Sequence, residues 1–362
     1  MHLYVHIPFC HHICPYCAFY KHKPGKLANE AFVDAILSEA KTRADLSDTG
    51  LKTIYFGGGT PSLLSGKWIT KLCEGLRQYF DLSGLEEWTI EANPATFDLK
   101  KARTMSDLGI SRVSLGTQSF QTDTLKTLGR DHSPDDAVRA YETLREAGFQ
   151  NISIDLMFSI PGQNASSWQA DLETAVSLKP DHFSAYNLTY EEDTEFLTRH
   201  QTGELDANED RDATLFYQAV DYLEDHGYRH YEISNYAREG FESRHNQGYW
   251  NGSDYLGLGP GAVSTISGER WKTLPDTARY VTRVQEGQDI RTDRETLTEE
   301  DRRLEAIALQ LRTARGVPAN LISSPNPVES LTQQGLIVQK EGRILLTREG
   351  KALADPIAGM LV

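Results

Sequence analysis

The sequence predicts an α/β protein built on parallel strands, as a barrel or a doubly wound sheet, followed by a small helical domain. Six short apolar segments alternate with amphipathic segments in the first half of the chain, and the pattern changes after about residue 290. Strand–helix units in series predict a parallel sheet covered by helices. The strand segments are apolar at nearly every position, which indicates burial on both faces.

The strand segments are residues 3–7, 53–56, 88–91, 112–117, 152–158 and 182–188. Amphipathic helices are predicted between them, at 29–44, 66–80, 98–108, 134–147 and 166–178. In residues 29–44, apolar residues recur at the i, i+3/i+4 spacing of one helix face. In barrels of this kind the functional residues gather at the carboxyl ends of the strands.

The rest of the chain has a different organisation. Residues 210–227 predict a helix, and a glycine-rich stretch runs from Gly248 to Gly261. Helices at 298–312 and 328–335, a hairpin at 336–347 and a last helix at 349–362 suggest a winged-helix-like domain. We therefore divide the chain at 1–205, 206–290 and 291–362.

Composition narrows the classes of function. The net charge is −15, from 52 acidic and 37 basic residues, which disfavours nucleic acid as a partner. No apolar run of about 18 residues predicts a membrane span, and the start of the chain has no secretory signal pattern. Three of the four cysteines lie within eight residues, which predicts a metal site in a reducing compartment, the cytoplasm.

The cysteine cluster reads Cys10-x3-Cys14-x2-Cys17, directly after the first strand. Thiolates are soft ligands suited to iron–sulfur clusters. Three thiolates on one loop can hold a [4Fe–4S] cluster and leave the fourth iron open for S-adenosylmethionine (SAM).

A zinc site of three cysteines and one histidine is the alternative, with His6, His11 or His12 as the fourth ligand. Zinc sites usually pair Cys-x-x-Cys motifs across a longer loop, so the cluster is favoured. Cys73 lies in a helical segment among apolar residues and is expected to be a core thiol.

Together with Gly57-Gly58-Gly59-Thr60-Pro61 after the second strand, the cysteine motif resembles the radical SAM superfamily over about residues 1–265. The resemblance implies a partial (β/α)6 radical SAM barrel with a small C-terminal winged-helix-like domain. Polar residues at or near the ends of strands three to five are costly unless partnered. They could also form a buried polar network that stabilises the barrel. By resemblance to the coproporphyrinogen-oxidase branch, the SAM-contacting positions are Tyr4, Gly58, Gly59, Thr60, Glu91, Gln118, Arg130 and Asp155, with Tyr16 beside the adenine and Thr189 as a weaker match.

Within that branch, the sequence is similar to the HemW haem chaperones rather than to the oxygen-independent coproporphyrinogen III oxidases. The oxidases carry a fourth cysteine where Phe19 stands, and they have a long extension before the first strand. Residues 245–250 match the His-Asn-x-x-Tyr-Trp motif of the chaperones. This implies a haem-handling role for 206–290, with His245 as a haem ligand and Tyr249 and Trp250 as flat faces for the porphyrin. The alternative is that His245 and Asn246 cap a turn while Trp250 packs against the barrel.

The resemblance implies a protein that binds a cluster, SAM and haem. It would deliver haem to an acceptor haem protein, such as a membrane-bound respiratory one, and take electrons from a flavodoxin or ferredoxin. A homodimer and peripheral membrane association are further expectations. Decarboxylation of coproporphyrinogen III is the enzymatic alternative, and whether SAM is turned over is left open. A radical SAM enzyme acting on tRNA is disfavoured by charge. Ser159 stands where relatives usually have glycine.

Overall fold

The computed structural model describes residues 1–25, 29–46 and 50–362. The first six strands pair in parallel, each with the next in the chain. They are β1 (His2–Ile7), β2 (Thr53–Gly58), β3 (Glu87–Ala92), β4 (Arg112–Gln118), β5 (Ile152–Phe158) and β6 (His182–Asn187). All six coincide with predicted strands, so the predicted parallel α/β fold is confirmed.

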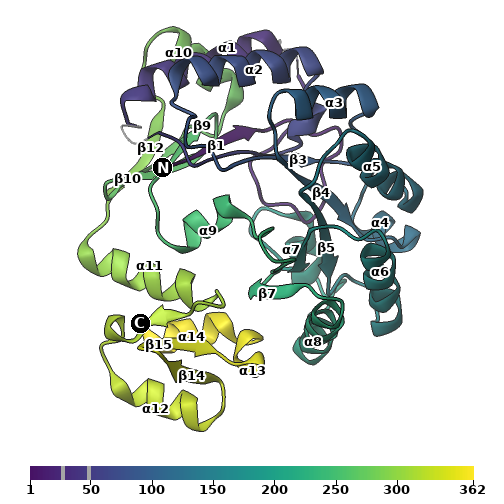
Figure 1. Ribbon diagram of the computed structural model, residues 1–362, viewed down its shortest axis with the longest axis vertical. Coiled ribbons are helices and arrows are strands. Elements are labelled where there is room, and N and C mark those ends of the chain that lie inside the picture. The colour runs from purple at the N-terminus through teal and green to yellow at the C-terminus, as the bar shows by residue number, and fades with distance from the viewer. Residues whose placement is uncertain (26–28, 47–49) are drawn as a thin grey trace.

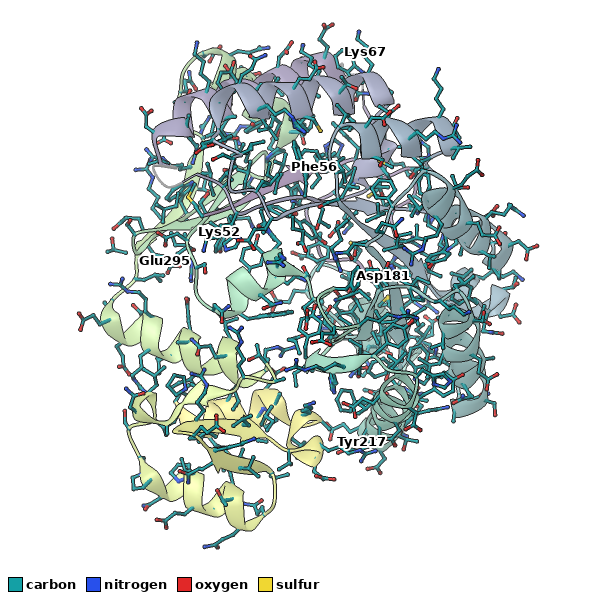
Figure 2. All side chains as sticks on the ribbon, in the orientation of Figure 1. Lys52, Phe56, Lys67, Asp181, Tyr217 and Glu295 are labelled. Carbon is teal, nitrogen blue, oxygen red and sulfur yellow. The ribbon has the colours of Figure 1, made fainter. Side chains whose placement is uncertain are left out.

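Helices cover the outer face of these strands (Figure 1). They are α1 (Asn29–Arg43), α2 (Gly66–Tyr79), α3 (Leu99–Asp107), α5 (Pro134–Glu146) and α6 (Ala165–Ser177). Short helices complete this layer, namely α4 (Thr122–Thr127), which the sequence analysis missed, and the 3-10 turns η1 (Ala44–Leu46) and η2 (Pro61–Leu63). Phe56, labelled in Figure 2, belongs to the core beneath them and packs edge-on to Trp88 at 5.7 Å between ring centroids.

The first five strands are buried on both faces, as predicted, but they are apolar on one face only. Every second residue is apolar and lies in the core beneath the helices, as Leu3, Val5 and Ile7 do in β1. The residues between them are mostly polar and bond across strands. His2 Nδ1 lies 2.8 Å from Thr53 Oγ1 in the neighbouring strand. The barrel interior is therefore lined by polar side chains, which suits a ligand site better than a packed core.

The chain then extends this sheet at both ends. Its further strands are β7 (Arg229–Glu232), β8 (Asn235–Ala237), β9 (Tyr255–Leu258), β10 (Val263–Ile266), β11 (Glu269–Thr273) and β12 (Arg291–Thr296). Their helices are α7 (Glu195–Gln201), α8 (Glu209–Asp225), α9 (Arg244–Trp250) and α10 (Thr277–Gln285). Within the described residues the twelve strands form one sheet in the order β12-β11-β10-β9-β1-β2-β3-β4-β5-β6-β8-β7.

The large sheet crosses the predicted boundaries between the three regions of the chain. Apolar side chains of residues 215–290 belong to the same core as those of the barrel. The middle region is therefore a continuation of the first body and not a separate one. The strand β12 also belongs to the large sheet, so the third region begins after it and not at residue 291.

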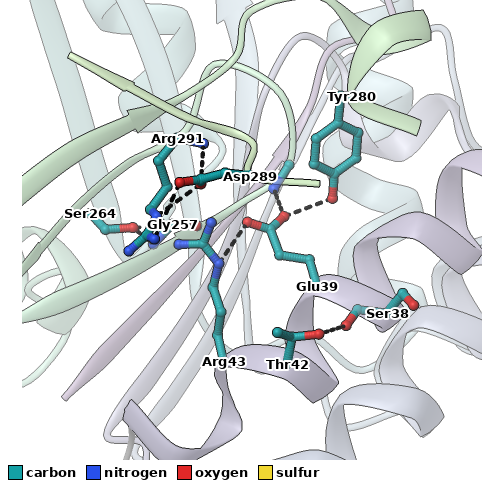
Figure 3. Close-up of polar contacts among 10 residues, drawn as sticks. Ser38, Glu39, Thr42, Arg43, Gly257, Ser264, Tyr280, Asp289 and Arg291 are labelled. Carbon is teal, nitrogen blue, oxygen red and sulfur yellow. Dashed lines mark hydrogen bonds and ion pairs between the residues drawn. The ribbon is translucent and has the colours of Figure 1, made fainter. Parts of the chain in front are cut away.

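A buried carboxylate joins the extension to the barrel (Figure 3). Glu39 of α1 accepts hydrogen bonds from Gly259 N at 2.9 Å and from the Tyr280 hydroxyl at 2.7 Å, and it pairs with Arg43 at 3.1 Å. Burial raises the pKa of Glu39 above its ordinary value. These partners come from α1, α10 and the end of β9, so one side chain ties three elements together.

The C-terminal domain has its own core. It contains α11 (Glu299–Leu311), β13 (Val317–Pro318), η3 (Ala319–Leu321), α12 (Pro325–Gln333), β14 (Ile337–Lys340), β15 (Arg343–Leu346), α13 (Arg348–Lys351) and α14 (Ala354–Leu361). The predicted order of helix, helix and hairpin is confirmed, while the last helix is split in two. In Figure 1 this domain lies below the large sheet, with α9 between the barrel and α11.

Candidate functional site

The three clustered cysteines lie on the loop that follows β1, and all three thiols are free and half-buried. Cys10 N donates to the carbonyl of His22 at 3.1 Å, which closes the loop on itself. Burial raises the pKa of the Cys10 and Cys17 thiols. Neutral thiols in such a place become thiolate ligands when a metal supplies positive charge.

Polar groups from two other loops reach this loop. The Thr60 hydroxyl lies 3.5 Å from Cys10 Sγ, and Arg130 Nη1 lies 3.7 Å from Cys14 Sγ. Hydrogen bonds to cluster sulfurs are one means by which a protein tunes such a centre. In the part of the chain that the structure describes, no three His, Cys, Asp or Glu side chains are grouped to hold a single metal ion. In a four-iron cluster each thiolate binds a different iron, so the three sulfurs do not have to converge on a single metal ion.

The glycine run at the end of β2 fits closely against the loop. A Cβ on Gly58, whose φ is +111°, would lie 2.6 Å from the His6 ring, and one on Gly59 would lie 2.7 Å from the Pro8 backbone. Gly59 N and Thr60 N donate to the carbonyls of Ile7 and Phe9. The glycines are thus required by contact with the chain itself, in addition to any ligand.

Glu91 lies at the end of β3 and points into the barrel. Its carboxylate accepts from the Tyr55 hydroxyl at 2.9 Å and from Gly58 N at 3.1 Å. Burial raises its pKa to about 7, although both hydrogen bonds oppose that shift. Tyr4 stacks on Tyr55 at 6.1 Å, and its hydroxyl lies 3.0 Å from His6 Nδ1.

Arg130 connects the cysteine loop to β4. Besides its contact with Cys14, its Nη2 donates to the carbonyl of Gly116 at 2.7 Å. Its Nε is buried and has no partner among the described residues, so one donor remains for a ligand. Gln118 ends β4 in a left-handed conformation, with φ of +67°, where the register with β5 shifts. Such backbone strain is often found at binding sites.

Asp155 lies within β5. Its two oxygens accept from Ser114 at 2.7 Å and from Ser153 at 2.8 Å, and burial raises its pKa. Tyr16 belongs to the cysteine loop and packs against Phe196 of α7, with 6.2 Å between ring centroids. Thr189 is exposed and donates to Glu191 at 2.6 Å, so the structure does not bring it into this group.

His245 does not have a free ring nitrogen, contrary to the expectation of a haem ligand. Its side chain is 0% exposed. Nδ1 lies 2.7 Å from Thr53 Oγ1, and Nε2 lies 2.9 Å from the Tyr249 hydroxyl. Burial lowers its pKa to about 3. Iron ligation through Nε2 would require Tyr249 to leave and α9 to open, so the structure favours a structural role.

The helix α9 closes the end of the barrel opposite the cysteine loop. Glu87 at the start of β3 accepts from Arg244 N at 3.0 Å and from His245 N at 3.1 Å. The Tyr249 ring meets His245 and Tyr255 edge-on and is half-buried. Trp250 points to the other side of the helix and meets Tyr231 at 5.8 Å. Of the three predicted haem contacts, Trp250 alone has its ring on the outer side of α9.

The sequence analysis missed much of the barrel lining, including Tyr55 and the buried Arg112. These residues could have been found from the sequence, because polar residues recur at every second position of each strand and such residues share one face of the strand. The lining includes His2, Tyr4, His6, Thr53, Tyr55, Glu87, Thr89, Glu91, Arg112, Ser114, Ser153, Asp155, His182, Ser184 and Tyr186.

Comparison with known proteins agrees with this geometry. The family description of the Radical SAM superfamily matches residues 4–175. Heme chaperone HemW of Bacillus subtilis is 34% identical over 369 residues, which is 98% of this chain and 97% of that protein. HemW of Lactococcus lactis is also 34% identical, over 98% and 95% of the two chains. The chain belongs to the HemW family of the radical SAM superfamily.

HemW of Escherichia coli is 37% identical over 76% of this chain and 71% of its own length. Among solved structures, coproporphyrinogen III oxidase (HemN) from Escherichia coli has a TM-score of 0.86 at 23% identity, covering 99% of this chain and 89% of that one. That likeness establishes the shared fold. In this HemW family member, no helix among the described residues is both long and apolar enough to cross a membrane.

Proposed function

We propose that this protein binds haem and delivers it to an acceptor haem protein, and that it holds a [4Fe–4S] cluster and SAM in its barrel. The observation that carries the proposal is the match to heme chaperones along nearly the whole chain, including α9 and the C-terminal domain. A membrane-bound respiratory haem protein is the acceptor we expect.

The cluster is proposed to bind through Cys10, Cys14 and Cys17. Two features of the loop support the fit. The thiols share one loop at the carboxyl end of a barrel strand, and Thr60 and Arg130 contact two of the sulfurs. Such thiols stay reduced in the cytoplasm, which is the compartment we propose, with peripheral contact to the membrane during delivery.

SAM is proposed to bind beside the open iron. Arg130 offers to the SAM carboxylate an Nε–H that has no partner among the residues described. Glu91 and Asp155 are acceptors for ribose hydroxyls, and Gly58, Gly59, Thr60, Gln118, Tyr4 and Tyr16 complete the proposed set. When bound, the cluster supplies an electron to SAM, for which a flavodoxin or ferredoxin would be the reductant. A homodimer is proposed from the resemblance alone.

The test is anaerobic turnover of coproporphyrinogen III on protein shown to contain its cluster, with SAM and reductant present. We expect no protoporphyrinogen, together with stoichiometric haem binding and transfer to an apo-haem protein. Phe19, 69% exposed on the cysteine loop, occupies the position where the oxidases are expected to carry a fourth cysteine. Product formation would make the protein a coproporphyrinogen oxidase and overturn the proposal.

A further inference from the structure

A pocket of about 290 Å³ lies between β7, α9 and the segment that follows α11. Its walls include Tyr231 from the large sheet, Trp250 from α9 and Thr313 from the C-terminal domain. The pocket lies on the face of α9 that points away from the barrel, because Gln247 and Trp250 lie on the opposite side of the helix from His245. It is therefore distinct from the proposed cluster and SAM site.

The charge of this pocket is opposite to that of the protein. Three arginines line it, Arg229, Arg244 and Arg315, against the single carboxylate of Glu242, while the whole chain carries −15. Arg244 pairs with Glu86 at 2.5 Å. In the described ranges, the side chains of Arg229 and Arg315 form neither an ion pair nor a hydrogen bond, so two guanidinium groups are available to an anion.

One wall of the pocket is aromatic. The rings of Tyr231 and Trp250 meet at 61° with 5.8 Å between centroids. The Tyr231 hydroxyl is already bonded to His182 at 2.7 Å and to Ser243 N at 3.1 Å, which fixes its ring. No described residue accepts a hydrogen bond from the Trp250 indole N–H, so this donor is also available.

The position of Arg315 is fixed by the way the C-terminal domain attaches to the sheet. Ile233 N donates to the carbonyl of Arg312 at 3.1 Å, and Ala314 N donates to the carbonyl of Tyr231 at 2.9 Å. These bonds continue β7 into the segment that carries Arg315. Backbone pairing between the two bodies therefore holds both arginines in the lining of the pocket.

We propose that this pocket binds the carboxylate edge of haem, with the propionates paired to Arg229 and Arg315 and the macrocycle against Trp250. The inference rests on the proposed haem-carrier function and assigns a place to the cargo. Ligand pockets that enclose a whole molecule span about 300–1,000 Å³. A pocket of about 290 Å³ is just below this range, so it would hold one edge of haem and leave the rest of the macrocycle exposed. Partial exposure suits a carrier, because a carrier must release its haem.

The test uses the full-length, cluster-loaded protein and two probes, haem and haem with both propionates esterified, at the same detergent concentration. We expect the double variant Arg229→Ala/Arg315→Ala to bind haem roughly tenfold more weakly, since two partly exposed charge pairs are lost. Its affinity for the ester should be unchanged. Trp250→Ala should weaken both probes alike. Arg279→Ala is the matched control, because it removes an exposed arginine on α10.

The outcomes separate the two proposals. Equal loss for haem and ester in the double variant, or no loss for either, overturns the pocket while leaving haem carriage in place. Loss of haem transfer to the acceptor with unchanged haem binding would mean that the arginines recognise the acceptor protein, and it also overturns the pocket. Failure of the wild-type protein to bind haem stoichiometrically overturns the proposed function and this inference with it. Higher salt should weaken haem binding more in the wild type than in the double variant.

Discussion

Replacement of His245 by alanine is expected to destabilise the barrel and to leave the iron coordination of haem unchanged. The wild-type ring is fully buried and bonded to Thr53 and Tyr249. Truncating a large buried side chain to alanine costs about 2–5 kcal/mol, and each lost hydrogen bond contributes about 1 kcal/mol within that total. We therefore expect the free energy of unfolding to fall by roughly 3 kcal/mol.

Urea unfolding followed by tryptophan fluorescence measures this loss, because all five tryptophans lie at or before Trp271 and therefore outside the C-terminal domain. His245→Asn is the matched variant, since its amide can still reach Thr53, and about half the loss is expected. The position of the haem absorption band should be the same in all three proteins. A shifted band in His245→Ala with an unchanged urea midpoint would refute the structural role and restore His245 as the iron ligand.

Four other changes test the site and the fold. Cys10→Ala should abolish the brown absorbance of the reconstituted cluster, whereas Cys73→Ala, in the helix core, should keep it. Glu91→Gln should remove a rise in SAM affinity between about pH 6 and 8, because the pKa of Glu91 is raised to about 7 and its ionised form accepts ribose hydroxyls better. Ser159→Gly should raise the free energy of unfolding by about 1 kcal/mol, since Ser159 has φ of +63° and a buried hydroxyl without a partner among the described residues. Ser159→Ala should raise it by less, because alanine removes the hydroxyl but keeps the backbone strain. Stability should fall as pH drops below about 6.5, as circular dichroism in urea would measure, because burial lowers the pKa of six histidines below the unfolded value and the unfolded state then binds more protons. These are His2, His6, His132, His182, His230 and His245. The raised pKa values of Glu39, Glu91 and Asp155 act in the opposite direction and make the fall shallower.

The sequence predicted the helix-covered half of the fold well because that half obeys simple periodicity. The ranges of β5 and α5 agree with the prediction to within one residue. The added strands β9 to β12 were missed, because they are short and their place in the sheet depends on partners distant in the chain. The last of them, Arg291–Thr296, is also highly charged. Pairing of β9 with β1 joins residues about 250 positions apart, which no local pattern encodes.

The candidate site was predictable as a set of residues but not as a set of contacts. The cysteine spacing and the strand ends indicated the loop and Glu91, whereas the contacts of Arg130 with Cys14 and Gly116 depend on the turn after α4. The role of His245 is the point at which the sequence and the structure differ most. A histidine in a recognised motif suggested a ligand, but its ring is bonded to Tyr249 and to Thr53, which comes from a strand almost two hundred residues earlier. Only the fold brings that hydroxyl to the ring.

The two faces of α9 explain why one short motif can carry both structural and binding residues. His245 and Tyr249, four residues apart, share the face that closes the barrel, while Gln247 and Trp250 share the face that lines the arginine pocket. The Tyr55 ring lies 5.0 Å from the His245 ring, between centroids, and the Tyr55 hydroxyl donates to Glu91. One tyrosine therefore contacts both α9 and the carboxylate proposed to bind the SAM ribose. The helix α9 therefore contacts both the pocket proposed for haem and the barrel proposed for SAM. If haem binding in the pocket displaces α9, we expect the displacement to reach Glu91 through the Tyr55 side chain, which contacts both.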